Sequence, residues 1–145
     1  MIRKITMTWP VWFTIPIRLA LGGIMFAHGA QKVLGIFGGP GFNAFINTPN
    51  TPYAFMKPAW LWWAAAALSE FIGGILIVLG LFTRVGAFFV ACTMAVAVLG
   101  VHWPAFFAPA GIEYPLALLA MAFSLLISGG GMASMDMALY GGRRR

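Results

Sequence analysis

Four long apolar segments, separated by turns and by most of the charged residues, dominate the pattern along the chain. They lie at residues 11–31, 59–82, 84–103 and 113–130. Each is close to the length of about 20 residues that a helix needs to cross the hydrocarbon core of a bilayer. Pro104 and Pro109 suggest where the third segment ends, and the glycine run at residues 129–131 ends the fourth. The pattern predicts an all-α, integral membrane four-helix bundle.

The composition agrees with a membrane protein and excludes an ordinary soluble domain. Hydrophobic residues fill 61% of the 145 positions and charged residues fill 8%. A soluble domain carries about 25% charged residues. We therefore expect residues 1–145 to form a single membrane domain. Cys92 is the sole cysteine, which excludes an intramolecular disulfide or a cysteine-rich metal site.

The distribution of basic residues predicts how the segments are oriented. With both termini in the cytoplasm, the inner side holds Arg3, Lys4, Arg84, Arg143, Arg144 and Arg145, and the outer side holds Lys32 and Lys57. The positive-inside rule favours this arrangement. The tryptophans then mark two membrane edges, with Trp9 and Trp12 inside and Trp60, Trp62, Trp63 and Trp103 outside. Because topology accounts for the net charge of +6, nucleic acid is not an expected partner.

A long apolar loop joins the first two segments on the outer side. It covers residues 33–58, is rich in Gly, Pro, Asn and Phe, and holds no charge before Lys57. Such a loop is expected to lie in the outer interface or to fold back over the bundle. A short helix is predicted around residues 42–46.

Ionisable residues inside the apolar segments are the first candidates for a site, because they are costly in a membrane unless paired or functional. Arg18, His28 and Lys32 share one face of the first helix, at about 100° per residue. Glu70 lies near the centre of the second segment, beside small residues that leave room for a neighbour. We predict an ion pair between Arg18 and Glu70. It would either fix the helix register or face a head group or a proton path.

A second set of polar residues falls in the outer half of the predicted bundle. It consists of His28, His102 and Glu113. These side chains could bind and protonate a quinone head group. Two other interpretations remain open: capping of helix ends at the interface, and, less favoured, metal or haem ligation. No catalytic residue is identified.

Two further charged residues lie near the inner surface. Asp136 is expected either to cap a short segment or to pair with Arg84, and a structural role is the favoured interpretation for both. Lys32 is grouped with them as a polar residue of structural or motif character.

The order of these motifs resembles the DoxX family over roughly residues 11–136. The resemblance is carried by Arg18, His28-Gly29 and Lys32 before GIFGGPGF, Glu70 with Gly73-Gly74, Gly80 and Thr83-Arg84, His102 before Glu113-Tyr114-Pro115, and Gly129-x-Gly131-x-x-Ser134-x-Asp136. It implies a small four-helix, multi-pass protein of the bacterial or archaeal cytoplasmic (inner) membrane. The family takes its name from the membrane part of a thiosulfate:quinone oxidoreductase.

Resemblance and residues together lead to one functional hypothesis and two alternatives. The leading hypothesis is a membrane subunit of a quinone-linked oxidoreductase or redox complex, with a quinone or proton site among Arg18, His28, Glu70, His102 and Glu113. The first alternative is a noncatalytic accessory subunit that anchors a larger complex. The second, less favoured, is a small proton-coupled transporter. The expected partners are the lipid bilayer and other membrane subunits or further copies of the chain.

Overall fold

The apolar segments form helices in the computed structural model, which describes residues 6–107 and 109–141. The described residues are helical with connecting turns and contain no strand. The helices are α2 (Thr14–Leu34), α3 (Phe42–Ile46), α4 (Ala59–Leu79), α5 (Thr83–Val96), the π-helix η1 (Ala97–Val101), α6 (Glu113–Ser128) and α7 (Met135–Tyr140). With η1 counted as the continuation of α5, the long helices begin and end within three residues of the predicted segments.

Two of these helices have the length and hydropathy of a membrane span within the described part of the chain. They are Ala59–Leu79 and Thr83–Val101, the second being α5 continued by η1. α6 is apolar but shorter, at 16 residues. α2 is 21 residues long and carries Arg18 and Lys32. The chain is therefore an α-helical protein with membrane-type helices.

Glycines in the left-handed conformation end two of the long helices. Gly35 follows α2 with φ of 71°, and Gly80 follows α4 with φ of 68°. Residues with a Cβ adopt this conformation at a cost, which is why glycine commonly follows the last helical turn. At Gly80 the backbone reverses and α5 begins three residues later. A tight connection therefore joins α4 to α5.

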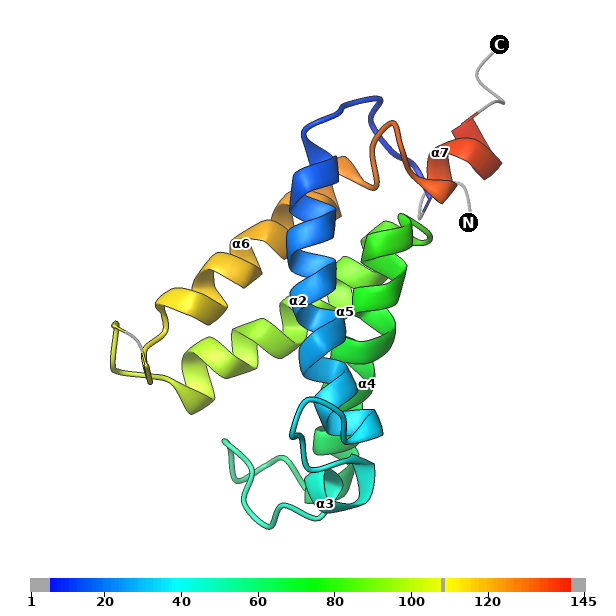
Figure 1. Cartoon of the computed structure of the whole chain (residues 1–145). Helices are drawn as coiled ribbons and strands as arrows, with labels where there is room; N and C mark the ends of the chain where they lie inside the picture. The colour runs from blue at the N-terminus through cyan, green and yellow to red at the C-terminus, as the bar shows by residue number, and fades with distance from the viewer. Residues whose placement is uncertain (1–5, 108, 142–145) are drawn as a thin grey trace.

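The long helices associate as two pairs that meet near one end of the molecule (Figure 1). α2 lies along α4, and α5 lies along α6. Figure 1 shows the second pair leaving the first at an angle, so that η1 and the start of α6 stand away from the lower part of α2 and α4. The junction is filled by buried apolar side chains, among them Leu21, Met25, Ile77, Val90 and Leu118.

Glycines set the closest approaches between helices. A Cβ added to Gly29 of α2 would overlap the backbone of Phe71 in α4. At the crossing of α4 and α5, a Cβ on Gly73 would lie 3.3 Å from the carbonyl oxygen of Gly86, and one on Gly86 would lie 3.1 Å from that of Gly73. Small residues allow helix backbones to approach closely in membranes. Close contacts at glycines therefore join α4 both to α2 and to α5.

Candidate functional site

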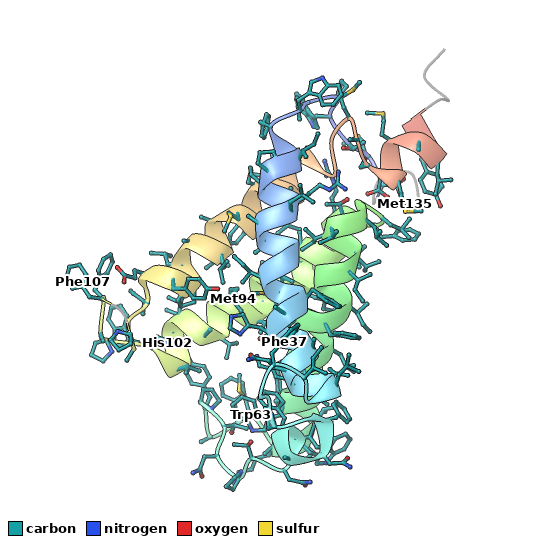
Figure 2. All side chains as sticks on the ribbon, in the orientation of Figure 1. Phe37, Trp63, Met94, His102, Phe107 and Met135 are labelled. Atoms are coloured by element: carbon teal, nitrogen blue, oxygen red, sulfur yellow. The ribbon has the colours of Figure 1, made fainter. Side chains whose placement is uncertain are left out.

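A pocket of about 400 Å³ lies between the two helix pairs. Its walls come from α2, α4, α5, η1 and α6, and residues of the loop after α3 close one side. Figure 2 shows Met94, His102 and Trp63, three of the lining residues, around the space between the pairs. The lining is mainly apolar, with polar groups from Lys32, Glu70, His28, His102, Ser69, Thr93, Thr51 and Tyr114. An apolar pocket with a few polar groups is the usual form of a small-molecule site.

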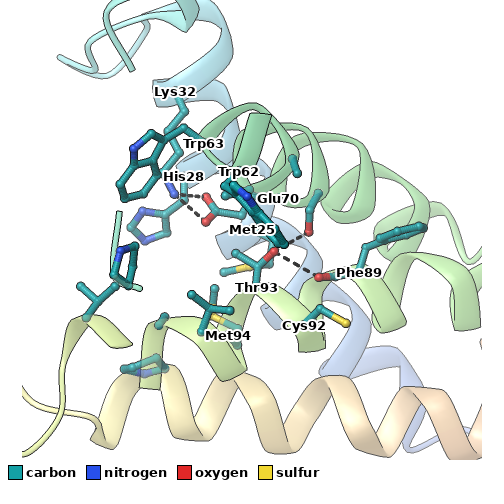
Figure 3. Close-up of a pocket in the computed structure, with 18 of the residues that line it drawn as sticks. Met25, His28, Lys32, Trp62, Trp63, Glu70, Phe89, Cys92, Thr93 and Met94 are labelled. Atoms are coloured by element: carbon teal, nitrogen blue, oxygen red, sulfur yellow. Dashed lines mark hydrogen bonds and ion pairs between the residues drawn. The ribbon is translucent and has the colours of Figure 1, made fainter. Parts of the chain in front are cut away.

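An ion pair between Lys32 and Glu70 lies in the wall of the pocket. Lys32 Nζ lies 2.5 Å from both carboxylate oxygens of Glu70, as the dashed lines in Figure 3 show. The Glu70 side chain is 4% exposed and the Lys32 side chain is 23% exposed. A carboxylate buried this deeply needs a charged or hydrogen-bonding partner. Lys32 supplies it from the last turn of α2, one turn after His28.

The short helix α3 covers the Lys32 side of this pair. Lys32 Nζ lies 5.2 Å from the centroid of the Phe45 ring. Phe45 in turn packs edge-on against Trp63 of α4, with ring centroids 5.3 Å apart. Trp63 Nε1 donates a hydrogen bond of 3.1 Å to the carbonyl oxygen of Thr48. The loop between α2 and α4 therefore folds back over the helices and places the Phe45 ring over the ammonium group of Lys32.

Both histidines line the same pocket from different helices. The His28 ring faces the Tyr114 ring of α6, with centroids 6.4 Å apart. His102 follows η1, and its Nδ1 lies 2.9 Å from the carbonyl oxygen of Ala110. A single π-turn within a helix is frequent at functional sites. Here the π-turn η1 follows α5 beside the pocket, and His102, the residue after η1, lines the pocket.

Two hydroxyl groups form a second polar position in the lining. Ser69 Oγ lies 2.8 Å from Thr93 Oγ1, and Thr93 Oγ1 donates a bond of 3.1 Å to the carbonyl oxygen of Phe89. The first bond joins α4 to α5 and the second lies within α5, and Figure 3 shows both on the side of the pocket opposite the His28 ring.

The predicted ion pair between Arg18 and Glu70 is wrong. Arg18 is 5% exposed and donates four hydrogen bonds to carbonyl oxygens. Its partners are Ile77 at 3.0 Å, Val78 at 2.7 Å, Gly130 at 3.0 Å and Ala133 at 2.7 Å. The last carbonyls of α4 lack partners within their own helix, and the guanidinium supplies donors to them. Glu70 meanwhile takes the nearer cation, Lys32.

The Asp136 side chain also forms hydrogen bonds at the end of a helix. Its carboxylate accepts hydrogen bonds from the backbone N–H of Phe82 and Thr83, at 2.8 and 2.9 Å, and from the Thr83 hydroxyl at 2.9 Å. It therefore caps the start of α5, where negative charge is favourable. Arg84 instead donates to the carbonyl oxygen of Ile127 at 2.7 Å.

The structure thus brings together four of the sequence-predicted polar residues and separates the others. His28, Lys32, Glu70 and His102 line the pocket. Arg18, Arg84 and Asp136 belong to the opposite end of the helices, and Glu113 begins α6 outside the described pocket lining. Sequence reasoning missed Ser69, Thr93, Tyr114 and Trp63. The position of Ser69 directly before Glu70 was a usable signal, but the partner of Ser69 lies 24 residues away.

The described residues line the pocket with apolar walls and a few polar groups. They contain no group of three or more His, Cys, Asp or Glu side chains arranged to hold a metal ion. The apolar walls suit an aromatic ring, and the ammonium and hydroxyl groups can meet ring oxygens.

Comparison with known proteins gives the family. The sequence profile of the DoxX family matches residues 13–103. A protein of Bacillus subtilis (strain 168) with the name "Putative oxidoreductase CatD" is 30% identical over 131 residues, which cover 90% of this chain and 90% of that protein. No solved structure matches the chain significantly. With the family profile covering more than half of its length, and with membrane-type helices in its structure, the chain belongs to the DoxX family of membrane proteins.

Proposed function

We propose that this protein is the membrane subunit of a quinone-linked oxidoreductase and that the pocket between the helix pairs binds the quinone. The observation that carries the proposal is the ion pair of Lys32 and Glu70 in the wall of an otherwise apolar pocket of about 400 Å³. Burying two charges costs free energy that apolar residues of similar size would not. A ligand with an apolar ring and polar oxygens would explain why the ion pair lies there, because the charged groups could form hydrogen bonds with the oxygens of the ligand.

Different residues of the pocket would contact different parts of such a ligand. Met25, Met94 and Leu118 offer apolar contacts for a ring. Lys32 has three N–H protons, and those not bonded to Glu70 can be donated to a ring oxygen. Glu70 and His28 can hold or release a proton near that oxygen. A bound quinone would supply two-electron redox chemistry coupled to protons.

The class of reaction is supported by the relative in Bacillus subtilis, whose name describes an oxidoreductase. We propose that a second subunit exchanges electrons with the quinone. In this proposal the helices of this chain contribute the binding site within the membrane.

The proposal includes four membrane spans with both termini in the cytoplasm of the inner membrane. α2, α4, α5 with η1, and α6 would be the spans. Arg84 lies at the end of the helices that carries α7, and Lys32 lies at the end that carries α3 (Figure 1). Arg3, Lys4 and Arg143 to Arg145, which also enter this topology, lie outside the described residues.

The test measures quinone binding by the purified protein in lipid nanodiscs. Bound lipids are extracted and analysed for quinone, and a benzoquinone with a decyl tail is titrated calorimetrically. Glu70→Gln and Lys32→Met each break the ion pair and should weaken binding at least about tenfold, the effect of losing one charged hydrogen bond. The matched controls are Glu113→Gln, outside the pocket lining, and Lys57→Met, an exposed lysine. Both should bind like the wild type.

Two results would contradict the proposal. The first is the absence of both extracted quinone and measurable affinity in the wild type, and the second is equal weakening in the pocket and control variants. If the protein without quinone affinity still co-purified with a redox enzyme, the accessory-subunit hypothesis would replace the quinone site.

A further inference from the structure

The hydroxyl protons of Ser69 and Thr93 both have acceptors within the protein. A threonine hydroxyl carries one proton, and Thr93 donates it to the carbonyl oxygen of Phe89, four residues earlier on α5. The 2.8 Å contact with Ser69 allows either oxygen to be the donor, and with the proton of Thr93 on the Phe89 carbonyl we assign Ser69 as the donor and Thr93 as the acceptor. Both protons are used inside the protein. The pair presents only oxygen lone pairs to the pocket.

The ion pair offers a different set of groups. Lys32 Nζ contacts both oxygens of Glu70 and retains N–H donor capacity, while the carboxylate retains lone pairs. This position can meet either a carbonyl oxygen or a hydroxyl group. Ser69 and Glu70 are neighbours on α4 and line the same pocket. One ligand can thus face an ion pair and an acceptor-only hydroxyl pair.

These donor and acceptor patterns distinguish the two redox forms of a quinone. A quinone has two carbonyl oxygens, which accept hydrogen bonds only, so the oxygen that faces Ser69 and Thr93 would meet lone pairs and lose its bond to water. The hydroquinone carries O–H groups that can donate to the Ser69 or Thr93 oxygen. Polar groups left unpaired in a buried site weaken binding by about tenfold or more.

Building on the proposed quinone site, we propose that the pocket selects the reduced ligand, a hydroquinone, over the corresponding quinone. Thr93 is the specificity-determining residue, because its bond to Phe89 fixes the direction of the bond from Ser69. Ser69 and Thr93 touch the ligand but take no part in proton transfer.

The experiment compares the affinities of decyl-benzoquinone and decyl-hydroquinone for the protein in nanodiscs, by anaerobic titration calorimetry. The wild type should bind the hydroquinone about tenfold more tightly, the effect of one buried hydrogen bond. Thr93→Val keeps the side-chain shape and removes the oxygen, so the preference should fall to about twofold or less, within the spread of such bonds. Thr93→Ser restores a hydroxyl and should restore the preference.

The outcomes separate this inference from the proposed function. Equal affinities in the wild type, tighter binding of the quinone, or an unchanged preference in Thr93→Val would overturn hydroquinone selection and leave the quinone site intact. Failure of both ligands to bind the wild type would overturn the proposed function and this inference together. The wild-type ratio alone decides the inference if Thr93→Val does not fold.

Discussion

At the scale of single residues, Arg18 shows how a buried cation can serve structure alone. Its guanidinium donates to two carbonyls at the end of α4 and to two in the turn after α6. Arginine presents five N–H donors in a planar fork, which suits four acceptors on different segments. Lysine carries the same charge as a compact group with three donors. The geometry of the donors, and not only the charge, therefore matters at this position.

We expect Arg18→Lys to lower the free energy of unfolding by about 3 kcal/mol, the cost typical of breaking a buried charged network. Arg18→Gln should cost at least as much, because it removes the charge and most donors. The measurement is denaturant unfolding in detergent, followed by circular dichroism. Lys57→Gln changes an exposed side chain and should stay within about 0.5 kcal/mol of the wild type. A wild-type stability for Arg18→Lys would show that charge alone is sufficient.

The sequence indicates which residues are unusual but not which of them pair. Arg18 and Glu70 are both deep in apolar segments, and spacing along a helix cannot tell how two helices are rotated and shifted against each other. The close contact at Gly29 and Phe71 decides that register. It brings Lys32 to Glu70 and leaves Arg18 beside the last turn of α4. Because pairing depends on this contact between helices, it was not predictable from either helix by itself.

At the scale of elements, the α2 and α4 pair depends on glycines that face the partner helix. Gly29 lies against the Phe71 backbone, and Gly22 lies against Val78 and Gly74. Gly23, next to Gly22, has no atom within 4 Å of the place where a Cβ would lie. One helix thus carries both a glycine that the packing requires and a glycine that it does not.

Gly29→Ala should separate α2 from α4 and destabilise the protein by about 1–3 kcal/mol, as overpacking commonly does. Gly23→Ala should be neutral or stabilising by up to about 1 kcal/mol, since alanine favours helix. Thermal unfolding in the same detergent compares the two. Since Lys32 lies on the same helix three residues from Gly29, Gly29→Ala should also weaken quinone binding. Equal stability of the two variants would contradict the close contact.

Helices were more predictable than their irregular parts. Apolar length and the Gly and Pro positions locate α4 and α6 to within three residues. The π-turn at η1 has no comparable signal in AVLGV. In the structure the π-turn packs against the outer loop, and a Cβ on Gly100 would lie 2.8 Å from Pro52 and 2.9 Å from Tyr53. A contact between residues some 50 positions apart cannot be read from local pattern.

At the scale of the whole molecule, the two ends of the helices differ in how they are held. At one end Arg18, Thr83 and Asp136 join α2, α4, α5 and the segment after α6 by buried hydrogen bonds. At the other end the helix pairs diverge and the pocket lies between them. Stability should therefore be unequal along the helices, as buried polar contacts oppose local opening.

Hydrogen exchange in nanodiscs should show this difference. Backbone amides of residues 77–83 and 134–138 should exchange more slowly than those of residues 48–57 and 98–103, because the latter lie in the loop and the π-turn beside the pocket. Added decyl-hydroquinone should slow the second group and leave the first unchanged. Uniform protection by the ligand, or none, would place its site elsewhere.

The bonds of Arg18 also affect the order in which the protein can be completed during synthesis. Its acceptors lie 59, 60, 112 and 115 residues further along the chain. Chains fold from the N-terminus as they emerge from the ribosome, so α2 exists long before the carbonyls that Arg18 needs. After α4 emerges, two acceptors are present, and the other two arrive only with residues 130 and 133. A nascent chain that stops after α5 leaves the Arg18 guanidinium without the acceptors at Gly130 and Ala133, so we expect such a truncated chain to be less stable than the full-length protein.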